Sequence, residues 1–265
     1  MYKKKINLSY FDLKDKVAIV TGAGGLLGKE HCKALEMAGC QIIALDIDIK
    51  KLKKLKGEIN CDYYLCDITN KKNILRIKKK ILKKYKKINI LINNAAIDFV
   101  PSKKNKKINF ENFSTKQLHK EIKVSINGSM LMSQIFGPLM VKNKNGVIIN
   151  VASDLSVIAP NQEIYSHLNI YKPVSYSIIK HGIIGLTKYL ASYWGKKNVR
   201  VNSLSPGGVF NNQDKIFHSK IKKLIPMNRM ANVNEYHGAI IFLCSDSSKY
   251  MNGHNLVIDG GRSII

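Results

Sequence analysis

The sequence contains few acidic residues and very few arginines. Its 265 residues include 44 lysines and arginines but only 18 aspartates and glutamates, a formal net charge of +26 at pH 7. Specific recognition of phosphates and bases favours the forked guanidinium group, so this lysine-dominated composition argues against a nucleic-acid partner. We interpret the lysine runs at 50–56, 71–87 and 103–107 as solvated faces of helices or as loops. The only four arginines are Arg76, Arg200, Arg229 and Arg262.

Cysteine and histidine offer no ligand pattern. The five cysteines are an odd number without a C-x-x-C pair, so we expect buried free thiols in a reducing compartment. The seven histidines show no metal-ligand spacing, and no metal is expected. No apolar run approaches the roughly 20 residues that span a bilayer, and the basic start lacks the apolar stretch of a signal peptide. We therefore expect a soluble cytoplasmic protein without a membrane partner.

Short apolar runs alternate with helical patterns along the whole chain, and no repeat or linker divides it. Near-continuously apolar strands are typical of a parallel sheet that helices cover on both faces. We predict one doubly wound α/β domain over residues 1–265 with a seven-stranded parallel sheet. The predicted strands are Val17–Thr21, Gln41–Asp46, Asp62–Cys66, Ile88–Asn93, Val147–Ser153, Val199–Ser205 and Asn255–Ile258. The predicted helices are Gly28–Ala38, Asn70–Tyr85, Gln117–Val141 with an interruption at Pro138, Val174–Trp194 and Val233–Cys244.

A glycine-rich turn joins the first predicted strand to the first predicted helix. This order places free backbone N–H groups and the positive end of the helix against a pyrophosphate. A turn that merely links strand to helix is the alternative. The candidate cofactor contacts are Thr21, Gly22, Gly25, Leu26, Leu27 and Gly28.

Asp46 ends the second predicted strand, about twenty residues beyond the glycine turn. A carboxylate at this place accepts hydrogen bonds from the adenosine ribose and repels a 2′-phosphate. No arginine follows Asp46, whereas Lys50 and Lys51 would weaken the discrimination. We therefore expect NAD as the cofactor in preference to NADP.

Tyr176 and Lys180 are spaced to share one face of a helix, one turn apart. A phenol is a poor base near neutral pH, because its ordinary pKa is about 10, but a neighbouring ammonium group favours the phenolate. Ser153 closes a strand at the carboxyl edge of the sheet, where α/β proteins bind their ligands. Each residue has a plain alternative, a solvated helix face for the pair and a turn or cap for Ser153.

Together, in this order, the glycine turn, Asn93-Asn94-Ala95-Ala96, Ser153 and the Tyr176–Lys180 pair resemble the short-chain dehydrogenase/reductase family. The resemblance extends from about Lys16 to Arg262. It implies a Rossmann-type fold and hydride transfer between an alcohol carbon and nicotinamide. Tyr176 would exchange the hydroxyl proton, Lys180 would lower the pKa of Tyr176 and hold the nicotinamide ribose, and Ser153 would bind the substrate oxygen.

The resemblance also implies cofactor contacts beyond the glycine turn. Asp67 and Ile68 would lie by the adenine, although Asp67 could instead be an ordinary helix cap. Asn94 and Ala95 belong to the element that ends in Ala96 here. The contacts expected near the nicotinamide are Pro206, Gly207 and Val209.

Two positions depart from the family pattern. Leu26 replaces the middle glycine of the turn, and we expect it to pack under the turn. Ser125 stands where the family has a fourth catalytic residue, an asparagine; we include Ser125 as a catalytic candidate that could bind a relay water. Asn127 lies about 200° around the helix from Ser125 and cannot substitute for it. This departure leaves open a chain with lower activity or none.

The interval between Ser153 and Tyr176 is about ten residues longer than is usual in the family. We expect the extra segment to form a substrate flap near 156–173, with polar aromatics and amides suited to a sugar, although a tolerated surface insertion is an alternative. Residues near 208–230 are expected to form a substrate lid. The resemblance implies a homodimer or homotetramer.

Several stretches, including the segment before Tyr176, look similar to oxidoreductases of bacterial surface-sugar pathways such as flagellin modification and legionaminic-acid-type synthesis. The resulting hypothesis is an NAD-dependent oxidoreductase that acts on a sugar or sugar-derivative hydroxyl or ketone. One alternative is an NADP-dependent 3-oxoacyl-type carbonyl reductase, which Asp46 disfavours. Another is a noncatalytic nucleotide-binding scaffold.

Overall fold

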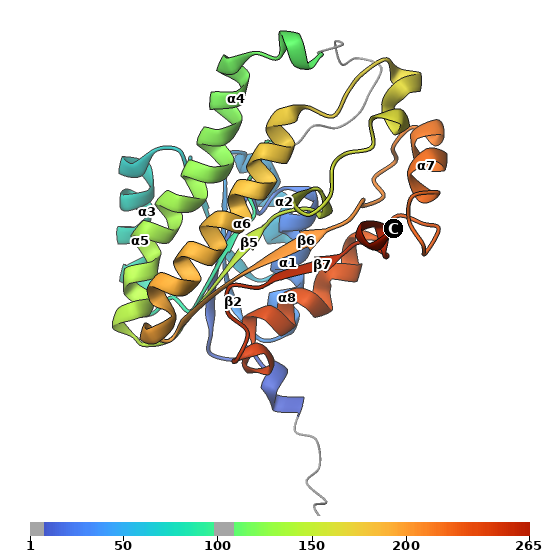
Figure 1. Cartoon of the computed structure of the whole chain (residues 1–265). Coiled ribbons are helices and arrows are strands. Elements are labelled where there is room, and N and C mark those ends of the chain that lie inside the picture. The colour runs from blue at the N-terminus through green and yellow to red at the C-terminus, as the bar shows by residue number, and fades with distance from the viewer. Residues whose placement is uncertain (1–7, 98–108) are drawn as a thin grey trace, which may run out of the picture.

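The computed structural model describes residues 8–97 and 109–265. Within these ranges the strands form one seven-stranded parallel sheet in the order β3-β2-β1-β4-β5-β6-β7 (Figure 1). The doubly wound α/β fold is therefore confirmed. The lysine run at 103–107 and the first seven residues lie outside the described ranges. The strands are β1 Val17–Thr21, β2 Gln41–Asp46, β3 Cys61–Leu65, β4 Ile90–Asn93, β5 Gly146–Val151, β6 Val199–Pro206 and β7 Asn255–Ile258.

The direction in which the sheet grows reverses at β1, and this reversal positions the site. β1 pairs with β2 on one side and with β4 on the other, so that Ala18 lies between Ile42 and Ile90. The helices that follow β1 and β4 therefore leave on opposite faces of the sheet. In an open α/β sheet this arrangement creates a crevice beyond the carboxyl ends of the strands.

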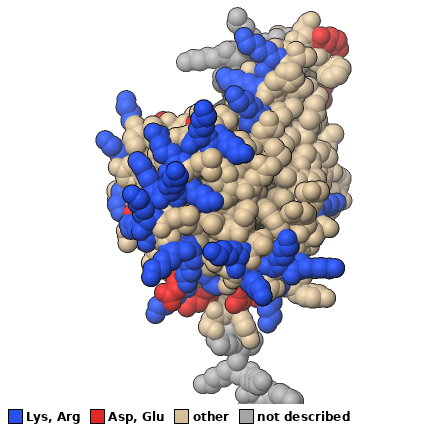
Figure 2. Space-filling model, turned by 90° about the vertical axis from the view of Figure 1, so that its left-hand side faces the viewer, with Lys and Arg blue, Asp and Glu red and all other residues tan. Residues whose placement is uncertain are grey.

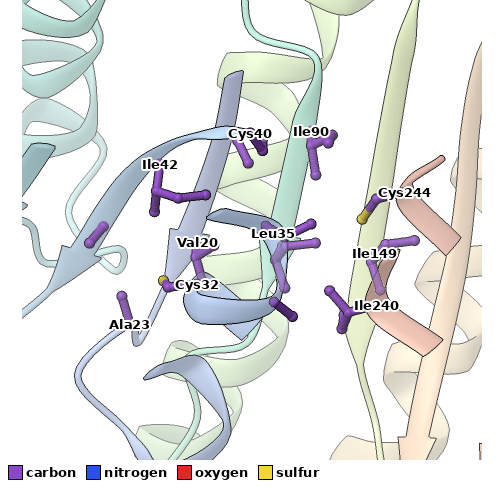
Figure 3. Close-up of a cluster of buried hydrophobic side chains, with 14 of the residues drawn as sticks. Val20, Ala23, Cys32, Leu35, Cys40, Ile42, Ile90, Ile149, Ile240 and Cys244 are labelled. Carbon is purple, nitrogen blue, oxygen red and sulfur yellow. The ribbon is translucent and has the colours of Figure 1, made fainter. Parts of the chain in front are cut away.

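Two helical layers cover the sheet and give it two cores. On one face α1 Leu26–Met37, α2 Ile49–Glu58 and α8 His237–Cys244 pack on the sheet, and Figure 3 shows part of this cluster. On the other face lie α3 Lys71–Lys84, α5 Gly128–Lys142 and α6 Val174–Trp194. Alternate residues of β1 enter different cores, since successive strand side chains point to opposite faces. This two-sided burial explains the continuously apolar strands.

All five cysteines are free and buried, as expected. Cys32, Cys40 and Cys244 lie in the cluster of Figure 3, among aliphatic side chains of the sheet, α1 and α8. Burial raises the pKa of the Cys40 and Cys66 thiols to about 12. The thiols therefore stay protonated near neutral pH and act as small apolar side chains.

The helices differ from the predictions in several places. The predicted helix Gln117–Val141 is divided into α4 Thr115–Ile122, a π-helical turn Lys123–Asn127 and α5. The interruption predicted at Pro138 is wrong, because α5 continues through Pro138. The pattern does not predict α2 or α7 Lys215–Lys222. The last predicted helix begins as a 3₁₀ turn, Val233–Tyr236, before α8.

The segment Thr115–Lys142 is long and apolar enough, by length and composition, to cross a membrane. Half of its most apolar window is buried, and α5 packs against β4, β5 and α3. This is the packing of a core helix, which owes its apolar character to the sheet that it covers.

Lysine side chains are spread over the face of the molecule that lies at the left of Figure 1 (Figure 2). On α3 the isoleucines Ile74, Ile77 and Ile81 are buried, whereas the lysines of the same helix are mostly exposed. The prediction of a solvated helix face is confirmed for this run. Asn70 caps the helix by accepting a hydrogen bond from the Asn73 N–H.

His31 is a fully buried histidine of α1, and neither ring nitrogen has a hydrogen-bond partner among the described residues. Burial, and secondarily the nearby His237, lowers the pKa of His31 to about 3. The unfolded chain would bind a proton at this position below pH 6.5, whereas the folded chain would not until about pH 3. Stability should therefore fall as the pH drops through this window, by up to about 1.4 kcal/mol per pH unit.

We expect urea unfolding to show a loss of about 2 kcal/mol from this one group between pH 7.5 and pH 5. The variant His31→Leu should lack this component, and His254→Gln, which alters an exposed histidine, should keep it. Equal pH dependence of the wild type and His31→Leu would contradict the assignment.

Candidate active site

The carboxyl ends of the strands border a cleft of about 710 Å³. It brings together nearly all of the residues that the sequence singles out, although they are spread over almost 190 positions. Thr21, Gly28 and Ser125 do not line it. The predicted residues that do are Gly22, Gly25, Leu26, Leu27, Asp46, Asp67, Ile68, Asn94, Ala95, Ser153, Tyr176, Lys180, Pro206, Gly207 and Val209.

The glycine turn is built so closely that side chains do not fit at two positions. Gly22 has φ +61°, and a Cβ there would lie 2.8 Å from the Ala95 Cα. A Cβ on Gly28 would lie directly against the Gly22 carbonyl oxygen and 2.7 Å from the Asn94 Nδ2. The expectation for Leu26 is wrong: its side chain is 40% exposed and lines the cleft. Leu26 is the first residue of α1, after Gly25 as N-cap, so it points outward rather than under the turn.

Thr21 and Asn94 join the glycine turn to the end of β4. The Thr21 hydroxyl donates to the Ile92 carbonyl (3.2 Å) and accepts from the backbone N–H groups of Asn94 and Ala95. The Asn94 amide donates to the carbonyl oxygens of Thr21 (3.0 Å) and Gly22 (3.1 Å). These bonds fix the two neighbouring strand ends: Asn94 lines the cleft, and Thr21 supports it without lining it.

Asp46 is fixed by two backbone hydrogen bonds at the end of β2. One carboxylate oxygen accepts from the Gly24 N–H and the other from the Asp48 N–H, each at 2.9 Å. The carboxylate thus sits beside the glycine turn at the rim of the cleft, where Lys51 also lies.

Asp67 is exposed after β3 and accepts hydrogen bonds from the Thr69 N–H and hydroxyl, each at 2.8 Å. It therefore closes a turn, while Asn70 is the cap of α3. Both Asp67 and the buried Ile68 line the cleft. A capping role for Asp67 on α3 is excluded by this geometry.

Two ammonium groups lie close to the ring of Tyr176. Lys180, one turn further along α6, has its Nζ 5.4 Å from the ring centroid, and this Nζ donates to the Val151 carbonyl at 3.3 Å. Lys172, from the flap, has its Nζ only 3.7 Å from the same centroid. Both cations are near enough to the ring for cation–π attraction.

Ser153 begins a 3₁₀ turn just beyond β5, two residues after the strand ends. Its hydroxyl donates to the Asp154 carboxylate at 2.8 Å and accepts a longer bond from the Leu155 N–H at 3.3 Å. The other oxygen of Asp154 accepts from the Arg262 guanidinium at 2.8 Å. Ser153 thus caps a turn and also lines the cleft, so its two predicted roles are compatible.

Ser125 lies in the π-helical turn between α4 and α5 and is 3% exposed. Its hydroxyl has no hydrogen-bond partner among the described residues. Asn127 is exposed, as its angular position on the helix predicts. A π-turn at this point is the kind of helix defect that often accompanies functional positions.

The segments expected to form the flap (156–173) and the lid (208–230) pack against each other (Figure 1). Tyr165 of the flap and Phe217 of α7 have ring centroids 5.4 Å apart, and the His167 Nε2 lies 2.7 Å from the Asp214 Oδ1. The Lys220 Nζ also donates to the Ser166 hydroxyl at 2.6 Å. The two segments share one hydrophobic cluster, which consists of Ile164, Tyr165, Leu168, Ile170, Phe217, Ile221, Ile225 and Met230.

Several charged residues line the cleft without having been predicted from the sequence, among them Asp154, Lys172 and Arg262. Asp154 directly follows Ser153, and this adjacency could have indicated that Asp154 belongs to the cleft. Arg262 comes 108 residues later, after two glycines, and no pattern links it to Ser153. The described residues contain no group of three or more His, Cys, Asp or Glu side chains able to hold a metal.

Known proteins resemble this chain in fold and in part of their sequence. A family model described as Enoyl-(Acyl carrier protein) reductase matches residues 22–263. A solved structure of a short-chain dehydrogenase from Leptospira borgpetersenii with bound NAD+ is 31% identical, with a TM-score of 0.84 over 99% of this chain and 98% of that one.

Curated relatives match over almost their whole length. The NAD-dependent glycerol dehydrogenase of Listeria innocua is 33% identical over 96% of each chain. The post-translational flagellin modification protein A of Campylobacter coli is 33% identical, over 94% of this chain and 98% of the relative. D-threitol dehydrogenase of Mycolicibacterium smegmatis is 30% identical over 96% of this chain and 95% of the relative. The chain belongs to the short-chain dehydrogenase/reductase family of NAD(P)-dependent oxidoreductases.

Proposed function

We propose that the protein is an NAD-dependent oxidoreductase that transfers hydride between nicotinamide and a hydroxyl or ketone of a sugar or polyol. The observation that carries this proposal is the position of Tyr176, close to two ammonium groups in the same cleft as Ser153. A small-molecule substrate is consistent with relatives named as glycerol and D-threitol dehydrogenases. The same proposal includes a homo-oligomeric enzyme in the cytoplasm.

The residues present fit a dinucleotide. The cramped backbone at Gly22 and Gly28 leaves N–H groups open to a pyrophosphate at the start of α1, where the helix dipole favours an anion. Asp46 would accept the ribose hydroxyls and disfavour a 2′-phosphate. When bound, the nicotinamide supplies or receives the hydride.

The side chains of the cleft handle the proton and the substrate oxygen. During oxidation Tyr176, as phenolate, would take the hydroxyl proton, and during reduction the neutral phenol would return it. Lys180 and Lys172 stabilise the phenolate because each places a positive charge near the ring. Ser153 would hold the reacting oxygen by a hydrogen bond. Ser125, whose buried hydroxyl has no partner in the part of the chain that the structure describes, would bind a water that passes the proton onward.

Cofactor choice is tested by titrating NAD+ and NADP+ into the wild type and Asp46→Ala. We expect the wild type to prefer NAD+, and the variant to lose about tenfold in NAD+ affinity together with most of the discrimination, because the ribose acceptor and the repulsive charge disappear together. Asp62→Ala is the matched control, since it removes a carboxylate at the opposite end of the neighbouring strand. Binding of neither nucleotide would refute the proposal.

Reduction of 3-oxoacyl chains is the second candidate function. The matching family model carries the name of an acyl-carrier-protein reductase, and a 3-oxoacyl-[acyl-carrier-protein] reductase of Thermotoga maritima is 29% identical. Lys51 at the cleft rim could bind a 2′-phosphate. A preference of the wild type for NADP+ in the same titration would favour this candidate. Binding without turnover of any substrate would favour the scaffold alternative.

A further inference from the structure

The last residues of the chain return to the end of the strand that carries Ser153. After β7, Asp259 accepts hydrogen bonds from the backbone N–H groups of Gly261 (3.0 Å) and Ser263 (2.7 Å). Gly260 and Gly261 have φ of +68° and +89°, a conformation that side chains disfavour. This tight turn directs Arg262 back to the cleft, where it meets Asp154.

The Asp154–Arg262 pair is buried to an extent that stability does not require. Asp154 is 3% exposed and Arg262 is 7% exposed. Withdrawing both charges from water costs about as much as their attraction returns, and apolar residues of similar volume often stabilise a fold equally well. The charge of Asp154 also affects a neighbouring side chain: burial first, and then the nearby Asp154 carboxylate, raises the pKa of the Tyr236 phenol. The stability of the fold therefore does not explain why a charged pair occupies this place.

The reason is visible in the hydrogen bonds of Asp154. One carboxylate oxygen accepts both the Ser153 hydroxyl and the Leu155 N–H at 2.8 Å, and the other accepts Arg262. A carboxylate that accepts the serine proton fixes the hydroxyl in one direction, and because serine carries a single O–H this proton must leave Asp154 before it can be donated to a substrate oxygen. The same negative charge, left alone, would oppose the negative charge that develops on a reacting oxygen beside Ser153. Arg262 offsets it.

We propose that Asp154 and Arg262 are positioning residues for Ser153: the carboxylate holds the serine hydroxyl in place until a substrate oxygen takes over its proton, and the guanidinium balances the charge of the carboxylate so that this hold can be exchanged. This inference rests on the proposed function, because it gives Ser153 a substrate oxygen to hold. It predicts that the two residues act as a unit. Loss of Arg262 alone is the most harmful change, since it leaves an uncompensated carboxylate in the cleft.

The test is a double-mutant cycle with Arg262→Met, Asp154→Asn and the double variant. The readout is reduction of NAD+ by glycerol, D-threitol or xylitol, whichever the wild type oxidises in a Tyr176-dependent way. We expect Arg262→Met to lower kcat by about 10- to 100-fold, with the NAD+ dissociation constant changed less than about twofold. The double variant should recover at least about fivefold over Arg262→Met, because it no longer holds an unpaired charge. Arg262→Lys should retain part of the activity.

Arg200→Met is the matched control for losing a largely buried guanidinium. Arg200 donates to the carbonyl oxygens of Leu243, Ser245 and Met251, away from Ser153. Its loss should lower the melting temperature but leave kcat per folded molecule unchanged. If Arg262→Met behaves in the same way, or if the double variant is no better than Arg262→Met, the pair is only structural and the inference is wrong. Absence of any Tyr176-dependent turnover would refute the proposed function and this inference with it.

Discussion

Replacing Tyr176 with phenylalanine is expected to lower turnover by about three orders of magnitude while leaving NAD+ affinity almost unchanged. The variant loses only the phenolic oxygen and keeps the ring that lies over Lys172 and beside Lys180. Packing in the cleft should therefore survive, and the loss isolates the proton transfer. The measurement is NAD+ reduction by a panel of polyols, together with NAD+ titration of the same preparation.

Tyr189→Phe provides the matched control on the same helix. Tyr189 is 65% exposed and stacks on Tyr193, with ring centroids 5.9 Å apart. Its loss of one hydroxyl should leave turnover at the wild-type level. Turnover by Tyr176→Phe within a few-fold of the wild type would show that the phenol is not the acid/base group.

Introducing a single methyl group at Gly28 is expected to remove measurable NAD+ binding and to destabilise the fold by about 3 kcal/mol. The new Cβ would meet the Gly22 carbonyl oxygen and the Asn94 amide. Neither group can move away easily. The Asn94 amide is hydrogen-bonded to Thr21 and Gly22, and Ala95 leaves no free space beside Gly22. The strain must therefore displace the turn that would hold the pyrophosphate. Melting temperature and NAD+ titration of Gly28→Ala measure the two effects.

The same substitution at Gly57 tests whether the space around Gly28 is the cause. Gly57 lies in the last turns of α2, and a Cβ there would have no atom within 4 Å. Gly57→Ala should leave NAD+ affinity unchanged and raise stability by up to about 1 kcal/mol, since alanine is the better helix former. Wild-type NAD+ affinity in Gly28→Ala would show that the glycine turn does not hold the cofactor.

The fold was predictable because its strands are buried on both faces. Continuous runs such as Val17–Thr21 leave little choice other than a parallel sheet between two helical layers. The helix Val174–Trp194 was predictable to the residue, because apolar side chains recur along it without a break. Short lysine-rich helices were harder: α2 buries only Leu52 and Leu55, which is too little apolar signal to separate a helix from a solvated loop.

The candidate site was predictable wherever its residues stand next to a strand end. Asp46 and Ser153 follow apolar strands, so their shared edge of the sheet could be inferred. Leu26 was misplaced, because its direction depends on which residue begins α1, and helix ends are the least certain part of a sequence argument. Lys172 and Arg262 reach the cleft through tertiary packing of the flap and of the last turn, which leaves no spacing to detect.

The shared hydrophobic cluster of the flap and the lid has a consequence for the entry and release of ligands. Two separate loops could open one after the other, but segments that bury side chains against each other open cooperatively or not at all. A molecule that enters or leaves must displace both segments together. The rate of product release would then depend on how readily the contacts between the two segments break. These contacts are Tyr165 with Phe217 and His167 with Asp214. The flexibility of either loop alone would matter less. The extra segment between Ser153 and Tyr176 would thus slow the exchange of ligands with solvent instead of making the entrance of the cleft more mobile.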